Sequence, residues 1–214
     1  MRLPLPRLML VTDRALRGGS EGLIAAVGEA LSGGVDAVQL REKNLPPDEL
    51  LPLAHRLRAL TRDRALLIVN GPLEVALACE ADGLHLPEAA SPVERPSAGF
   101  MVGRSVHSPE AARRAEAEGA DYLIAGPVYA TPSHPHVPPA GVDLISEVAA
   151  AVRLPVLGIG GVSEGRVAEV IRAGAVGVAV ITAVLAAPSP EGAARALRRA
   201  LDAACASERV PRPR

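Results

Sequence analysis

The stretch AVQLREKN carries polar side chains at alternate positions. Side chains alternate between the two faces of a β-strand, so Gln39, Arg41 and Lys43 would share one face. Burying a glutamine and an arginine without partners is costly. The stretch therefore predicts either an internal polar network or a site for an anionic ligand. Lys43 is the only lysine of the chain and Gln39 its only glutamine, which favours the ligand.

A second stretch, PVLGIGGVSEGRV, places four glycines within eight residues. Their spacing is not the G-x-G-x-x-G fingerprint of dinucleotide-binding folds. Glycines let backbone amides approach a ligand, and the loops after the last two strands of a barrel commonly bind phosphate. We predict a phosphate site formed by Gly160 and Gly161 with Ile181 and Thr182. Tight packing of a loop on a helix is the alternative.

Other candidates for chemistry follow the ends of apolar runs. Asn70 could cap a helix or bind a ligand. His107, in GRSVHS, and His134, in the long loop TPSHPHVPP, are candidates for proton transfer, because imidazole exchanges protons near pH 7. The histidines of that loop have no evident third ligand, so we predict no metal site.

These residues need elements that bring them together. Short apolar runs rich in Val, Leu and Ile alternate with helical patterns, as expected for strands covered on both faces. The predicted strands are Leu8–Thr12, Ala37–Arg41, Leu66–Asn70, Gly83–Leu86, Met101–Val106, Tyr122–Val128, Pro155–Ile159 and Gly177–Ile181.

Eight strands alternating with helices predict an α/β protein with a single (β/α)8 TIM barrel. We place the barrel at residues 1–207 and a disordered tail at residues 208–214. An open, doubly wound sheet is the competing architecture. In a barrel, the ends of the strands that carry the polar residues would meet at one mouth.

Composition limits the classes of function. With 214 residues, 49% of them hydrophobic, and a formal net charge of -1, the chain fits one compact domain and shows no basic stripe for nucleic acid or anionic membranes. No apolar run is long enough to span a bilayer. Two cysteines in helical patterns indicate thiols of a cytoplasmic protein. A homodimer is compatible with a small barrel, but no interface can be identified.

Several stretches together resemble the thiamine-phosphate synthase superfamily. They are VTD, VQLREK, LIVN, GLHL, GRSVHS, GADYLIAGPVYATPS, PVLGIGGV and GVAVITAVL, in this order along nearly the whole chain. The resemblance implies a (β/α)8 barrel and one of two activities. A synthase joins a hydroxymethylpyrimidine diphosphate to a thiazole phosphate with magnesium and releases pyrophosphate. A TenI-like tautomerase moves a proton on a carboxythiazole phosphate and needs no cofactor.

The synthase pattern assigns roles to residues already singled out. It implies that the pyrimidine diphosphate is held by Gln39, Arg41, Lys43 and Asn70. It implies that the thiazole phosphate is held by Gly160, Gly161, Ile181 and Thr182.

Three positions depart from that pattern. Gly71 and Ala90 stand where the synthase carries aspartates, and His134 stands where it carries a lysine. Magnesium prefers carboxylate oxygens together with phosphate, so these losses should weaken its binding. The departures favour the tautomerase branch, although Pro127 stands where that branch has its catalytic histidine.

We therefore predict a thiazole tautomerase that takes a thiazole phosphate as substrate and uses no metal. His107 or His134 would move the proton, and Arg41 and Lys43 would face the substrate carboxylate. The alternatives are a thiamine-phosphate synthase with magnesium and a non-catalytic, ligand-binding barrel.

Overall fold

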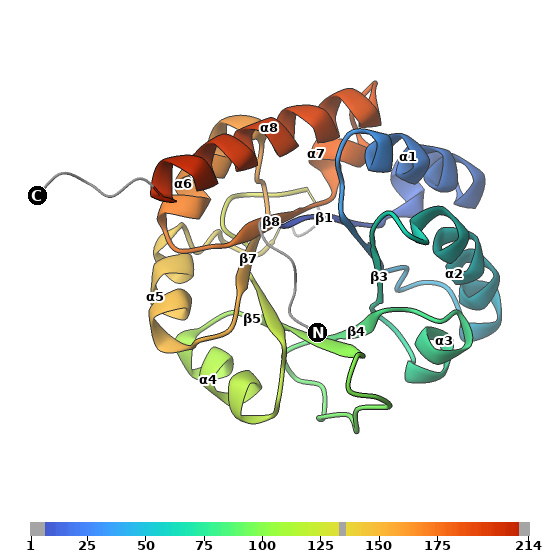
Figure 1. The fold of residues 1–214 in the computed structure, drawn as a ribbon, viewed down its shortest axis with the longest axis horizontal. Coiled ribbons are helices and arrows are strands. Elements are labelled where there is room, and N and C mark those ends of the chain that lie inside the picture. Colours follow the sequence, from blue (N-terminus) through green and yellow to red (C-terminus); the bar gives the residue numbers. More distant parts are fainter. Residues whose placement is uncertain (1–6, 133–135, 210–214) are drawn as a thin grey trace, which may run out of the picture.

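Eight parallel strands close into a barrel inside a ring of helices (Figure 1). The computed structural model describes residues 7–132 and 136–209. Each strand pairs with its neighbour in sequence, and β8 (Gly177–Val180) closes the barrel on β1 (Arg7–Val11). The predicted (β/α)8 barrel is confirmed, and the open sheet is excluded.

The other strands lie close to the predicted ranges. They are β2 (Ala37–Leu40), β3 (Leu66–Val69), β4 (Gly83–Leu86), β5 (Met101–Val106), β6 (Tyr122–Ala125) and β7 (Val156–Ile159).

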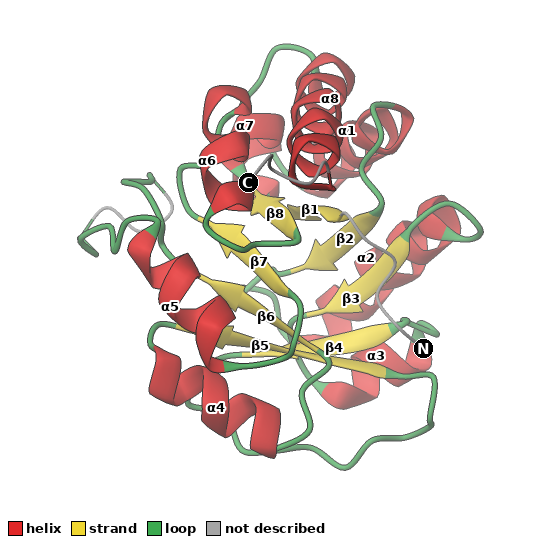
Figure 2. Cartoon of the chain, turned by 60° about the vertical axis from the view of Figure 1, so that its left-hand side comes forward, coloured by secondary structure: helices red, strands yellow, loops and turns green. Residues whose placement is uncertain are grey.

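The helices follow the strands and cover their outer faces (Figure 2). They are α1 (Ser20–Ser32), α2 (Pro47–Thr61), α3 (Leu73–Ala78), α4 (Pro109–Ala117), α5 (Asp143–Ala151), α6 (Val167–Arg172), α7 (Thr182–Leu185) and α8 (Pro190–Arg209), with short 3-10 turns η1 (Arg14–Arg17) and η2 (Glu164–Arg166). The tail predicted from residue 208 thus begins inside α8, and residues 210–214 lie outside the described part of the chain.

Alternation along the strands produces two hydrophobic layers. On β2, Val38 and Leu40 belong to the layer between strands and helices. Side chains such as Met9 on β1 and Ile68 on β3 fill the barrel interior. Because Gln39 has the opposite parity to its apolar neighbours on β2, its side chain lies inside the barrel, where it contacts Met9.

Five strands end earlier than predicted, and two of these differences affect the site. β2 ends at Leu40, and the chain turns at Lys43. β6 ends at Ala125, before Pro127, which has no amide hydrogen to continue the ladder.

In the described residues, no helix is both long and apolar enough to cross a membrane.

Candidate active site

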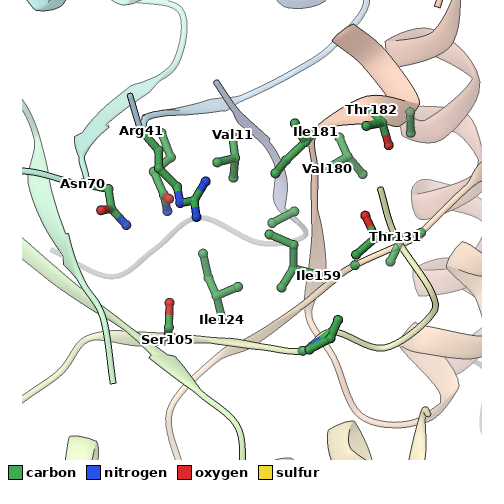
Figure 3. A pocket seen from close by; sticks show the side chains of 18 of the residues that line it. Val11, Arg41, Asn70, Ser105, Ile124, Thr131, Ile159, Val180, Ile181 and Thr182 are labelled. Atoms are coloured by element: carbon green, nitrogen blue, oxygen red, sulfur yellow. The ribbon is translucent and has the colours of Figure 1, made fainter. Parts of the chain in front are cut away.

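A cavity of about 310 Å³ opens at the carboxyl ends of the strands. Parallel strands all end at the same side, so residues far apart in sequence meet there. Figure 3 shows Arg41, Asn70 and Ser105 on one side of the cavity and Thr131 and Thr182 on the other. Apolar side chains lie between the two sides, namely Val11, Ile124, Ile159 and Ile181.

Arg41 gives the first side its charge. Its backbone N–H donates to Thr12 Oγ1 at 2.9 Å, which fixes the chain just after β2. Within the described residues, its guanidinium forms neither a hydrogen bond nor an ion pair. Burial lowers the pKa of Arg41, while the charges of Asp13 and Glu42 partly offset that effect. A half-buried arginine without a partner at a cavity wall favours an anionic ligand.

Lys43 does not line the cavity, although alternation along an extended strand places it on the same face as Arg41. Strand β2 stops before it, and its side chain is exposed in the turn that follows. The pKa of Lys43 is lowered, first by the charge of Arg41 and then by burial. The two cations therefore repel each other at the mouth, and an anion held between them would relieve that repulsion.

Gln39 and Asn70 complete the polar side. Gln39 is 2% exposed, and its Nε2 donates to Met9 Sδ at 3.7 Å. The backbone N–H of Asn70 donates to the carbonyl of Leu40 at 2.8 Å, which extends the β2–β3 ladder by one residue. The Asn70 side chain points toward the cavity (Figure 3).

The opposite side is built from backbone. Gly160 and Gly161 have φ of 100° and 62°, conformations that favour glycine. A Cβ at Gly160 would overlap Pro127, and one at Gly161 would overlap the carbonyl of Ala130. The glycines are thus needed for close packing, but against the segment after β6 rather than against a helix.

These glycines also leave backbone donors at the cavity wall. Among the described residues, the N–H groups of Gly161 and Thr182 donate to no protein acceptor. Both residues line the cavity, as do Gly160 and Ile181. Unsatisfied amides beside a hydroxyl are a suitable environment for phosphate oxygens.

A cluster of side chains holds this wall from outside. The guanidinium of Arg166 lies 4.4 Å from the ring centre of Tyr129 and donates to the carbonyl of Gly161 at 2.8 Å. The Tyr129 hydroxyl donates to Glu169 Oε2 at 2.6 Å. Burial and the neighbouring Glu169 raise the pKa of Tyr129 to about 12. The loops after β6 and β7 are therefore tied together.

The two histidines predicted to move a proton have different outcomes. His107 lies at the rim of the cavity, with its side chain 59% exposed. Glu88 accepts from its backbone N–H at 2.8 Å and lies 2.7 Å from its Nδ1. His134 lies outside the described residues.

A buried polar group at the floor of the cavity was not among the predicted site residues. His85 is 1% exposed and lines the cavity together with Ser105. Its Nε2 lies 2.8 Å from Ser105 Oγ, and its Nδ1 lies 3.3 Å from the hydroxyl of Tyr122. A histidine, a serine and a tyrosine on three successive strands were the available signal, but only the strand register shows that they meet.

The donor set does not fit a magnesium ion. Among the described residues, no carboxylate lines the cavity. The described residues hold no group of three His, Cys, Asp or Glu side chains suited to a metal. Glycine and alanine occupy positions 71 and 90, so neither position offers a side-chain oxygen to the ion.

Comparison with known proteins gives a consistent family. A family model described as thiamine monophosphate synthase matches residues 8–184. A thiamine-phosphate synthase from Roseiflexus sp. (strain RS-1) is 45% identical over 201 residues, which cover 91% of this chain and 85% of that protein. A putative thiamine-phosphate synthase from Geobacter sulfurreducens is 44% identical over 196 residues, which cover 89% of this chain and 92% of that protein.

Solved structures agree on the architecture. A structure titled thiamine phosphate pyrophosphorylase from Pyrococcus furiosus has a TM-score of 0.84 and 36% identity, and the match covers 92% of this chain and 96% of that one. A 3-hexulose-6-phosphate synthase has a TM-score of 0.69 at 18% identity, covering 92% of this chain and 100% of that one, and shows the shared fold alone.

Proposed function

We propose, since the chain belongs to the thiamine monophosphate synthase family, that it is a transferase of thiamine biosynthesis. It would join a hydroxymethylpyrimidine diphosphate to a thiazole phosphate and release pyrophosphate. The observation that carries this proposal is the division of the cavity into a cationic side at Arg41 and an amide-rich side at Gly161, separated by apolar side chains.

The predicted tautomerase is wrong. The relatives that overturn it are named thiamine-phosphate synthase, and their sequences are 43–45% identical to this chain. The missing aspartates misled the interpretation, because they were weighed as evidence of another reaction. The proton-transfer roles of His107 and His134 depended on that reaction and are withdrawn with it.

The two sides of the cavity suit the two substrates of a synthase. The diphosphate of the pyrimidine would lie against Arg41, with Gln39 and Asn70 beside it and Lys43 reaching over the mouth. The phosphate of the thiazole would be held by the amides of the β7 and β8 loops, namely Gly160, Gly161, Ile181 and Thr182. The apolar side chains between them would hold the two rings.

The chemistry then needs charge stabilisation more than proton transfer. The bond between the pyrimidine methylene carbon and the diphosphate breaks, and the electron pair leaves with pyrophosphate. A bond forms between that carbon and the thiazole nitrogen. Negative charge grows on the leaving group, where the guanidinium of Arg41 can stabilise it.

Magnesium enters only through the family resemblance. Because the residues at the cavity do not fit the ion, we derive no step through it. This disagreement predicts that the protein alone binds Mg²⁺ weakly. Replacing both Gly71 and Ala90 with aspartate should tighten Mg²⁺ binding at least about tenfold, measured by calorimetry with the metal alone, since carboxylates are its preferred protein ligands.

Gly71 can accept this change. A Cβ there would meet Leu50 Cδ2 at 3.2 Å, so a flexible side chain must move only slightly. A matched control carries Gly71→Asn and Ala90→Asn, which are similar in size but uncharged. Equal Mg²⁺ affinity in the aspartate and asparagine variants would show that these two positions are not a metal site.

The proposed function is tested by measuring pyrophosphate and thiamine phosphate together. The purified protein should form the two products in equal amounts, and only when both substrates are present. Binding of both substrates without product, at any Mg²⁺ concentration, would instead identify a non-catalytic barrel. The variant Arg41→Met separates enzyme-dependent release from background hydrolysis.

A further inference from the structure

A chain of three polar side chains crosses the barrel interior below the cavity. Tyr122 on β6, His85 on β4 and Ser105 on β5 form it, with the two contacts at His85 of 3.3 Å and 2.8 Å. Tyr122 is fully buried and His85 is 1% exposed, whereas Ser105 reaches the cavity. The Ser105 hydroxyl points into the cavity in Figure 3.

The strand register creates the space for this chain. His85 pairs with Gly103, and Gly103 pairs with Tyr122, so the three residues stand level on adjacent strands. A Cβ at Gly103 would overlap the Tyr122 ring and its hydroxyl. Because Gly103 has no side chain, the hydroxyl of Tyr122 can reach the ring of His85.

Protonation sets the number of hydrogens in the chain. Burial, followed by the charges of Arg104 and Arg41, lowers the pKa of His85 to about 3, so its ring is neutral and carries a single N–H. Burial raises the pKa of Tyr122, so its hydroxyl keeps its proton. Neither group changes its charge between pH 5 and pH 9.

The direction of these hydrogen bonds follows from the need of the buried Tyr122 hydroxyl for an acceptor. Among the described residues, its one hydrogen-bond partner is Nδ1 of His85. If Nδ1 carried the hydrogen, the Tyr122 proton would be buried without an acceptor, which is unfavourable. Tyr122 therefore donates to Nδ1, and the hydrogen of His85 lies on Nε2.

The same reasoning fixes Ser105. Its oxygen accepts the Nε2–H of His85, so its own hydrogen is turned away from the ring and toward the cavity. Without Tyr122, the neutral ring could take either tautomer. Ser105 could then donate to His85 and present only lone pairs to a ligand.

We propose that Tyr122 is a positioning residue that, through His85, keeps Ser105 a hydrogen-bond donor toward the cavity. The site would then select a ligand atom that accepts a hydrogen bond and carries no hydrogen, as an aromatic ring nitrogen does. That this atom belongs to the pyrimidine rests on the proposed function, whereas the direction of the chain does not.

The tautomer can be measured without any ligand. In protein labelled with ¹⁵N at histidine, long-range ¹H–¹⁵N spectra should show His85 with hydrogen on Nε2 and a bare Nδ1, unchanged from pH 5 to pH 9. The variant His85→Gln assigns the signal, and a shift of the same signal in Ser105→Ala assigns it if the glutamine variant does not fold. Hydrogen on Nδ1 in the wild type would overturn the inference.

Kinetics then test the coupling between the two ends. Ser105→Ala and Tyr122→Phe should each lower kcat/KM about fivefold to tenfold, mainly through KM of the pyrimidine substrate, as expected for one hydrogen bond. In the double variant, the tyrosine change should add less than about twofold, because both act through one hydroxyl.

Additive effects would overturn the inference, since they would mean that Tyr122 acts by packing alone. Thermal unfolding of each variant separates loss of fold from loss of the hydrogen bond. If the wild type releases no pyrophosphate, the proposed function fails, but the tautomer measured by NMR still decides this inference.

Discussion

Three aspartates at the amino-terminal end of the barrel are paired, whereas the guanidinium of Arg41 at the carboxyl-terminal end is not, within the part of the chain that the structure describes. At the amino-terminal end, Asp36, Asp82 and Asp121 each stand just before an even-numbered strand. Each accepts a backbone N–H of the preceding odd-numbered strand, from Leu8 at 2.9 Å, Leu67 at 2.7 Å and Val102 at 2.7 Å. Each also pairs with an arginine, namely Arg198, Arg58 and Arg95.

At the carboxyl-terminal end, a positive charge is available to a ligand. The guanidinium of Arg41 faces the cavity, and in the described residues no carboxylate binds it. The other wall offers backbone amides instead of paired side chains. The difference teaches that the paired charges connect neighbouring strands, whereas the charge of Arg41 has no partner among the described residues at the cavity where we propose that the diphosphate binds.

The largest effect is expected from the variant that removes the charge of Arg41. We expect Arg41→Met to lower kcat/KM about 100-fold, because the variant lacks the preorganised positive charge that would stabilise the leaving pyrophosphate. The free energy of unfolding should stay the same or increase, since a half-buried cation disappears. Steady-state pyrophosphate release and urea unfolding measure the two effects.

The control for that change is Arg62→Met, at an exposed arginine that pairs with Glu80. It should alter neither quantity beyond about 0.5 kcal/mol. If Arg41→Met retained wild-type kcat/KM, the assignment of the cationic side to the diphosphate would be lost.

The amino-terminal end should show the reverse behaviour. Asp121→Ala removes the acceptor of the Val102 N–H and the partner of Arg95, so we expect the free energy of unfolding to fall by about 2 kcal/mol. Turnover at 25 °C should be unchanged, because the site is at the other end.

Glu191→Ala is the matched control, because Glu191 forms an exposed i,i+4 pair with Arg195. Its loss should cost less than about 0.5 kcal/mol by the same urea titration. A drop in turnover for Asp121→Ala larger than its fraction unfolded would contradict the separation of the two ends.

A smaller effect is expected at the amide-rich wall. Gly161→Ala places a Cβ against the carbonyl of Ala130 at a φ of 62°, so the loop must shift. We expect KM for the thiazole phosphate to rise about tenfold, with KM for the pyrimidine diphosphate nearly unchanged.

Gly165→Ala tests whether this effect is local. Gly165 lies in the same loop, and a Cβ there meets nothing within 4 Å. Its KM values should equal those of the wild type. Equal changes in both KM values of Gly161→Ala would mean that the cavity is not divided between the substrates.

The last expected effect is a change of the free energy of unfolding with pH. His85 titrates at pKa about 3 in the folded chain, well below its ordinary value. Below pH 6.5, His85 is protonated in the unfolded chain but stays neutral in the folded chain. Lowering the pH therefore lowers the free energy of unfolding. Between pH 6 and pH 4, His85 should contribute about 1 kcal/mol per pH unit.

Urea unfolding at several pH values measures this slope, and His85→Gln should reduce it. The comparison of the two proteins separates the contribution of His85 from the contributions of all other ionisable groups. Equal slopes in both proteins would show that His85 is protonated in the native state.

Much of the fold was predictable because the strand signal is local. Apolar runs of four to six residues between helical patterns located all eight strands, and parity alone placed Gln39 inside the barrel. The prediction for Lys43 differed because parity holds only while the chain stays extended, and β2 ends at Leu40.

The rest depended on registry between strands. The meeting of His85 with Tyr122 and Ser105 requires three strands in one alignment, which sequence spacing does not encode. The aspartates before β2, β4 and β6 repeat a pattern in VDAV, ADGL and ADYL, but the sequence does not show which groups they bind. The reaction was mistaken because two missing carboxylates outweighed similarity along the whole chain.

The division of the cavity has a consequence for how such barrels diversify. The amide-rich wall comes from the backbone after β7 and β8, whereas the polar side chains stand on β2 to β5. If the proposed phosphate site is correct, substitutions on β2 to β5 can change which second substrate is recognised while the amide-rich wall still binds the phosphate. After gene duplication, one copy could keep the amide-rich wall unchanged while substitutions on the other wall give it a new substrate.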